Sequence, residues 1–126
     1  MMRLFRGSRR EYAVTTMLRH MEHGRFPQAL RALRRWRAGP WPPPHALWRL
    51  GRWCLEKSRP RWAKRPLEIF LELYPGHQDR PEVMRDLARA HGGPKGQSLA
   101  VEALSLGAER DSRRQAQIVP NALNGS

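Results

Sequence analysis

The chain has 126 residues, about the length of one domain, and 40% of them are apolar. A domain of this size can bury a core if its apolar residues lie on consistent faces. Every apolar run is far shorter than the roughly 20 residues of a membrane-spanning helix, so no span of a bilayer is predicted. The single cysteine, Cys54, excludes an internal disulfide and fits a reducing compartment such as the cytoplasm.

The net charge of +13 is distributed unevenly along the chain. Residues 1–43 carry +8, residues 44–77 carry +4 and residues 78–111 carry −1. An excess of this size attracts polyanions such as nucleic acid, anionic lipid or an acidic protein surface. Of the 24 basic residues 21 are arginine, a skew that a GC-rich coding sequence also produces. The charge therefore indicates a class of partner without establishing one.

The two ends of the chain differ from its middle. Residues 1–9 form a basic N-terminal extension without the apolar stretch and cleavage site of a secretory signal. An arginine-rich, acid-free start is also typical of organellar presequences, although this one is short for that class. Residues 112–126 lack hydrophobic periodicity and are predicted to be a disordered tail.

Hydrophobic periodicity predicts six helices, at about 9–22, 27–38, 45–57, 60–73, 79–91 and 96–107. Pro27, Pro60 and Pro81 fall in first turns, where a missing N–H is harmless. Pro66 lies within the fourth helix, which predicts a later start or a kink there. The proline-rich segment 39–44 favours polyproline II and predicts a stiff connection that sets the first hairpin off from the others.

A period of 34 residues runs through the chain. Four positions recur in each of three units: a small residue, an apolar residue or proline, a third position that is Ala in the first two units, and an apolar residue. These are Gly24, Phe26, Ala29 and Leu33 in the first unit, Ser58, Pro60, Ala63 and Leu67 in the second, and Gly92, Pro94, Gln97 and Val101 in the third. Small residues let two helix backbones approach closely, and apolar residues three and four apart form one stripe per helix. Each hairpin alone exposes its stripe, so stacked hairpins are predicted.

The middle unit, residues 44–77, is the most regular of the three. Its small, apolar and proline positions are Leu47, Leu50, Gly51, Cys54, Ala63, Leu67, Phe70 and Pro75. This spacing resembles the tetratricopeptide repeat. The unit at 10–43 matches best in its second helix, and the unit at 78–111 is the weakest. The resemblance implies an all-α fold, a right-handed α-α superhelix (solenoid) of about three helix hairpins over residues 10–111.

Proteins of the tetratricopeptide type usually bind partners on the concave surface that the first helix of each unit lines. The resemblance implies an inner, partner-binding groove formed by His45, Trp48, Arg52, Glu56, Asp79, Glu82 and Asp86. The middle of this groove is rich in Arg and Trp and its third unit is acidic, so a peptide or protein of complementary charge is expected to bind in one direction. Trp48 is the expected hot spot. The alternative is that Trp48 packs against the proline segment.

The second helices predict a basic patch on the convex side. Its members are Arg31, Arg34, Arg35, Arg37, Arg61, Lys64 and Arg65. With the neighbouring rings of Trp36 and Trp62, such a patch is suited to bind RNA or DNA, because basic groups neutralise phosphates and aromatic rings stack on bases. The other interpretation is an ordinary solvated helix surface.

Residues suited to catalysis are few. His20 and His23 lie three apart with no third metal ligand nearby, and Cys54 is too far from His45 on the same helix for a thiolate–imidazole pair. No glycine-rich phosphate loop is present. The sequence predicts a non-enzymatic interaction scaffold or adaptor without cofactor or metal. Completion of so short an array by oligomerisation or by a partner protein stays open.

Overall fold

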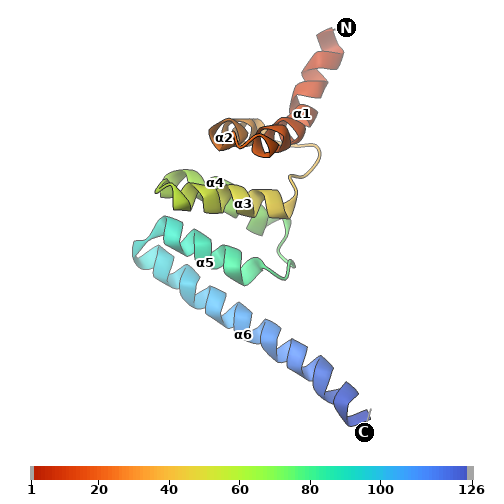
Figure 1. The fold of residues 1–126 in the computed structure, drawn as a ribbon, viewed down its shortest axis with the longest axis vertical. Helices are drawn as coiled ribbons and strands as arrows, with labels where there is room; N and C mark the ends of the chain where they lie inside the picture. The colour runs from red at the N-terminus through yellow and green to blue at the C-terminus, as the bar shows by residue number, and fades with distance from the viewer. Residues whose placement is uncertain (1, 125–126) are drawn as a thin grey trace.

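The computed structural model describes the backbone of residues 2–124 and the side chains of residues 12–110. It confirms the all-α class, because the described residues contain helices and no strand. The six helices are α1 (Met2–Glu22), α2 (Phe26–Arg35), α3 (Pro44–Glu56), α4 (Pro60–Leu73), α5 (Arg80–His91) and α6 (Gly93–Asn124). Figure 1 shows them as three layers from the N-terminal to the C-terminal end.

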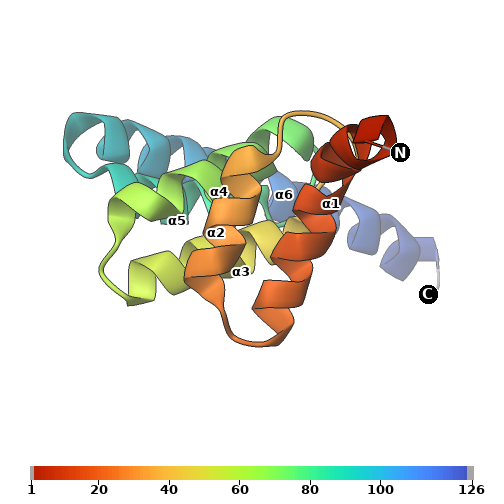
Figure 2. The same cartoon turned by 90° about the horizontal axis from the view of Figure 1, so that it is seen from above.

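Each layer is a hairpin of two consecutive helices. α1 packs along α2, α3 along α4 and α5 along α6. Between the hairpins, α4 packs closely on α5. The first hairpin packs less extensively on the second, through α2 against α3 and α4. Viewed from above, the hairpin α1–α2 lies over the hairpin α3–α4 (Figure 2). One apolar cluster runs through all three hairpins, from Met17 on α1 to Val83 on α5.

The 34-residue period is present in the backbone of the hairpin turns. Left-handed φ angles recur at Gly24 (71°), Ser58 (58°) and Gly92 (65°). In the first two turns the amide of the next residue closes the same loop: Arg25 donates to the carbonyl of His20 at 2.7 Å, and Arg59 donates to that of Cys54 at 2.8 Å. A left-handed residue favours glycine because it lacks a Cβ. The chain therefore reverses in the same way in the first two hairpins.

The third turn is different, and it shifts the register of α6. Gly93 also has a positive φ of 60°, and α6 begins at that residue. The expected core positions Gln97 and Val101 are therefore wrong, since both are exposed. Gly96 is buried instead, and a Cβ there would meet the backbone carbonyl oxygen of Ala88 at 2.6 Å. Gly96 therefore takes the helix-contact position that Ala63 has in the second unit, and the spacing between the two residues is 33 instead of 34.

The close contact between paired helices occurs at small residues, as predicted. Ala29 and Ala63 are fully buried. A Cβ on Gly51 of α3 would lie 2.5 Å from the nearest Leu67 side-chain atom on α4. Leu67 is itself fully buried, so it occupies the space that glycine leaves open. The distance between α3 and α4 thus depends on this pair.

The proline-rich linker is bound to both of its neighbouring hairpins. The Trp36 indole Nε1 donates to the carbonyl of Pro40 at 3.0 Å, and the Tyr74 hydroxyl donates to that of Pro42 at 2.6 Å. Trp41 contacts the Tyr74 ring edge-on at 5.7 Å between centroids. The linker therefore attaches the first hairpin to the end of α4, whereas the sequence predicted that it would set this hairpin apart.

Three helix boundaries differ from those predicted. α4 begins at Pro60 and contains Pro66 as a buried residue, so the expected later start is wrong. α1 extends back to Met2, through the predicted N-terminal extension, and α6 continues to Asn124, past the end expected near 107. Good helix formers such as Ala, Glu, Arg and Gln dominate from 108 to 117. The backbone is thus helical over 112–124 of the predicted tail, and 125–126 lie outside the described residues.

Within residues 2–124, no helix combines the length and the apolar character that crossing a membrane requires.

Reciprocal substitutions in the turns test the period. Ser58→Gly should raise the free energy of unfolding by about 1 kcal/mol, because a left-handed conformation costs a residue with a Cβ about that much. Gly24→Ser should lower it by a similar amount, since nothing lies within 4 Å of the new Cβ and only the backbone preference changes. Urea unfolding of both variants measures the two changes. Effects of the same sign would contradict the shared turn geometry.

A second pair of variants tests the contact between α3 and α4. Gly51→Ala should destabilise by about 1–3 kcal/mol of overpacking, reduced by the roughly 1 kcal/mol that alanine contributes as a better helix former. In a Leu67→Ala background the same change should stabilise, because the methyl group then has room. The free energy of unfolding, measured for all four proteins, gives the coupling. An equal effect in both backgrounds would exclude the contact.

Candidate functional site

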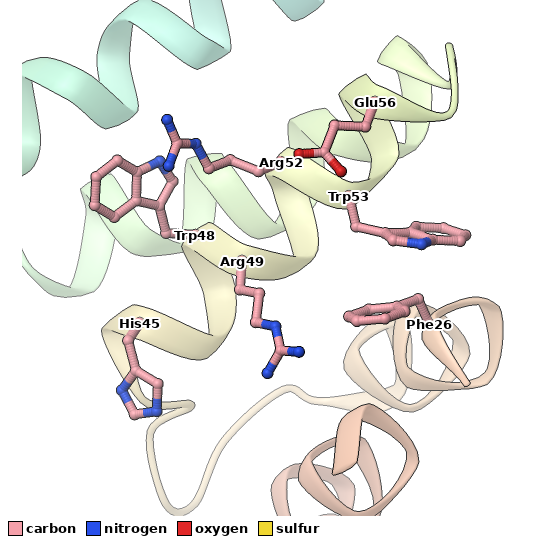
Figure 3. A pocket seen from close by; sticks show the side chains of 7 residues that line it. All are labelled: Phe26, His45, Trp48, Arg49, Arg52, Trp53 and Glu56. Atoms are coloured by element: carbon pink, nitrogen blue, oxygen red, sulfur yellow. The ribbon is translucent and has the colours of Figure 1, made fainter. Parts of the chain in front are cut away.

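One face of α3 lines an open cavity of about 410 Å³ between the first and second hairpins. The four predicted groove residues of this helix, His45, Trp48, Arg52 and Glu56, all lie on its wall. They come together because residues three and four apart share one side of a helix. Figure 3 shows them along α3, with the first hairpin below and the third above. This surface, together with its neighbouring cavity described below, is called the α3 groove.

Three further residues line the same cavity and were not predicted. Phe26, the first residue of α2, stacks on Trp53 of α3 with 5.1 Å between ring centroids and 16° between planes (Figure 3). The Arg49 guanidinium lies 5.6 Å from the centroid of the Phe26 ring. These contacts join the first hairpin to the second. The sequence signal is the aromatic Phe26 before Pro27, which the 34-residue period identifies only as an apolar repeat position.

Trp48 and Arg52 bind an acid of the next hairpin. The Trp48 indole Nε1 donates to Asp86 Oδ2 at 2.7 Å, and Arg52 Nε lies 3.4 Å from the same oxygen. The Arg52 guanidinium also lies 4.8 Å from the centroid of the Trp48 ring. Asp86 is only 6% exposed, so its prediction as an exposed groove residue is wrong. The Trp48 indole N–H is thus directed to the third hairpin, and the tryptophan that bonds to the proline segment is Trp36.

The other two predicted acids of the third unit are also paired. Glu82 accepts hydrogen bonds from Arg110 of α6 at 2.8 and 3.0 Å. Burial acts to raise the pKa of Glu82, but the hydrogen bond and positive charge of Arg110 outweigh it and hold the pKa below its ordinary value. Asp79 lies 3.8 Å from the His77 imidazole. Glu82, like Asp86, is therefore paired with arginine within the protein.

The α3 groove continues toward α5 as a second cavity of about 260 Å³. Its walls include Arg52, Leu55, Glu56, Asp86 and Arg89. Arg89 lies 3.8 Å from Asp86 Oδ1, which completes the neutralisation of that carboxylate. With Asp86 paired, the groove offers arginine and histidine side chains, aromatic rings and one exposed acid, Glu56. The part of the groove beside Phe26 is aromatic and has more arginines than acids on its walls, whereas the second cavity has two arginines and two acids and no aromatic ring.

The predicted basic patch is formed mainly by exposed residues. Arg31, Arg34, Arg35, Arg37, Arg61 and Arg65 are exposed and Lys64 is half-buried. The Arg37 guanidinium donates to the carbonyls of Arg34 and Trp36 at the end of α2. Trp36, expected beside the patch, instead directs its indole N–H to the linker. The patch thus lies on α2, on Arg37 just after its end and on the first half of α4.

The residues that could support covalent or metal chemistry are not gathered into a site. Cys54 is fully buried, and burial raises the pKa of its thiol to about 11, so the thiol is protonated at neutral pH. Among the described side chains, no three of the His, Cys, Asp and Glu residues lie close enough together to hold a metal ion.

No protein-family model matches the chain, and no curated protein or solved structure matches it. The fold class is that of an all-α protein of stacked helix hairpins. The tetratricopeptide resemblance stays a prediction.

The bond between Trp48 and Asp86 has a measurable effect on stability. Trp48→Phe keeps an aromatic ring under Arg52 but leaves the buried carboxylate without its indole donor. The free energy of unfolding should fall by about 1.5–3 kcal/mol, the range for a hydrogen bond to a charged group. The matched control is Trp41→Phe, an exposed position that keeps its edge contact with Tyr74 and should change stability little. Equal losses in both variants would argue against the indole bond as a link between hairpins.

Proposed function

We propose that the protein is a non-enzymatic scaffold of the tetratricopeptide type, in which hairpins in a right-handed superhelix bind an acidic peptide segment of a partner protein in the α3 groove. The cavity between the first two hairpins carries this proposal. It combines aromatic rings with arginine side chains, the residue types that dominate binding hot spots. A reducing compartment such as the cytoplasm fits the free Cys54.

The charges of the groove support an acidic partner. Arg49 is exposed, and its only described ring contact is with Phe26, so its charge is available to a carboxylate. His45 is exposed at the start of α3, where it adds a further donor. A guanidinium can bind a carboxylate through two parallel hydrogen bonds, which fixes the partner's position. A basic peptide would lack these contacts and would meet several like charges.

The rings of the groove support apolar side chains beside the acids. Phe26 and Trp53 form one wall by stacking, and Trp48 is half-buried on another. Because these rings are already held in place, little side-chain entropy remains to be lost when a partner binds. The groove is therefore suited to an acidic segment that contains at least one aromatic or large aliphatic residue.

The test is a selection of binding peptides from a random display library on the intact protein. The selected peptides should carry acidic residues around an apolar one, and their affinity should fall about tenfold or more in Arg49→Glu, because this change places a like charge in the groove. The matched control is Arg61→Glu, the same change at an exposed position of α4 outside the groove. Isothermal titration calorimetry gives the three dissociation constants.

Arg49 is a better probe than Trp48, because Trp48 also holds Asp86 and its loss would lower stability as well as binding. Circular dichroism should show unchanged helix content in Arg49→Glu. Selection of basic peptides, or an equal loss of affinity in Arg61→Glu, would overturn the proposal.

A further inference from the structure

A second charged surface lies outside the α3 groove, on α2 and the beginning of α4. Its exposed members are Arg31, Arg34, Arg35, Arg59, Arg61 and Arg65. This set is called the outer basic surface. Within the described side chains, none of these arginines lies within ion-pair distance of a carboxylate. The outer basic surface therefore keeps the charge of its arginines.

Trp62 lies in the middle of this surface. It is 36% exposed, the smallest exposed fraction among the large apolar residues that are classed as exposed. Trp36, Trp41, Trp48 and Trp53 each bond or stack with a residue outside their own turn of helix. The described ring contact of Trp62 is with Arg59, three residues before it, whose guanidinium lies 4.8 Å from the ring centroid. The described ring contact of Trp62 therefore does not link it to another helix.

The Trp62 ring also forms one wall of a cavity of about 160 Å³ between α2 and α4. The other walls are Pro27, Leu30, Arg31 and Arg34 of α2. Its lining combines the apolar side chains of Pro27 and Leu30 with two arginines. A flat aromatic group that enters it would stack against the indole, and a negatively charged group attached to it would meet the arginines.

We propose that the outer basic surface binds single-stranded nucleic acid, with one unpaired base stacked on Trp62 and the adjoining phosphates bound by the arginines. Arginine binds phosphate through a planar, two-pronged set of donors. A nucleic-acid base is accessible for stacking on a side chain where it is unpaired, because the duplex covers both of its faces. An acidic peptide would satisfy the charges but would not need the exposed ring.

The test is fluorescence polarisation of the full chain with labelled oligo-deoxythymidine and oligo-uridine of about 12 nucleotides. Both should bind, and affinity should fall steeply between about 50 and 200 mM salt. Trp62→Ala should weaken binding by about 5- to 150-fold, the value of one stacked base. Trp62→Phe should retain most of the affinity. Trp41→Ala, at a tryptophan that is more exposed and lies in the proline-rich linker, should change it little.

Substitutions of single arginines distinguish direct phosphate contacts from attraction by the net charge of the protein. Arg31→Gln and Arg34→Gln should each flatten the slope of log affinity against log salt by about 0.7, which corresponds to one phosphate contact on a single strand. Arg85→Gln removes the same charge from an exposed position on α5 and should leave the slope unchanged. A duplex of the same length should bind more weakly than the single strand.

Several results would overturn the proposal: no binding at about 50 mM salt, full affinity in Trp62→Ala, an equal effect of Arg85→Gln, or equal binding of duplex. Competition by poly-glutamate as effective as that by unlabelled oligonucleotide would show a surface for acidic proteins instead. The proposal is independent of the α3 groove. Arg49→Glu should leave oligonucleotide binding nearly unchanged, so failure of one function does not imply failure of the other.

Discussion

The stack of hairpins depends on how closely the two helices of each hairpin approach at one small residue. At Gly51 the absent side chain leaves the space that Leu67 fills, and at Gly96 the backbone of α5 lies against the glycine itself. The left-handed residue of the turn, such as Ser58, returns the second helix at that distance. Since each hairpin then presents its apolar stripe in a similar way, the next hairpin can cover it.

A buried acid determines the character of the surface that this stack exposes. Asp86 of α5 is held by the Trp48 indole and the Arg52 guanidinium of α3. A buried carboxylate is tolerated only where such partners neutralise it. The same contacts fix two side chains of the α3 groove in position and pair one of its two acids, which leaves Glu56 as the exposed one. The cavity beside Phe26 is aromatic and has more arginines than acids, which is the basis for proposing an acidic partner.

Much of the fold follows from local patterns in the sequence. Proline in the first turns and the spacing of Ala29 and Ala63 predict the helix pairs, because these features act within one hairpin. The burial of Asp86 could not be predicted in this way, since it depends on an indole 38 residues earlier in the chain. The shift of register in α6 follows from the second left-handed glycine, Gly93, whose conformation the sequence does not specify.

The candidate sites were predicted only where their residues lie on one helix. The residues of the α3 groove on α3 itself share one helix face, so their spacing places them together. Phe26 joins them from the first hairpin, and Trp62 and Arg31 line their cavity across the same boundary between the first and second hairpins. Two-dimensional NMR of the five indole N–H signals tests the account of two separate binding faces most directly. A selected acidic peptide should shift the signals of Trp48 and Trp53, and an oligonucleotide should shift that of Trp62. Movement of the same indole signals by both ligands would contradict it.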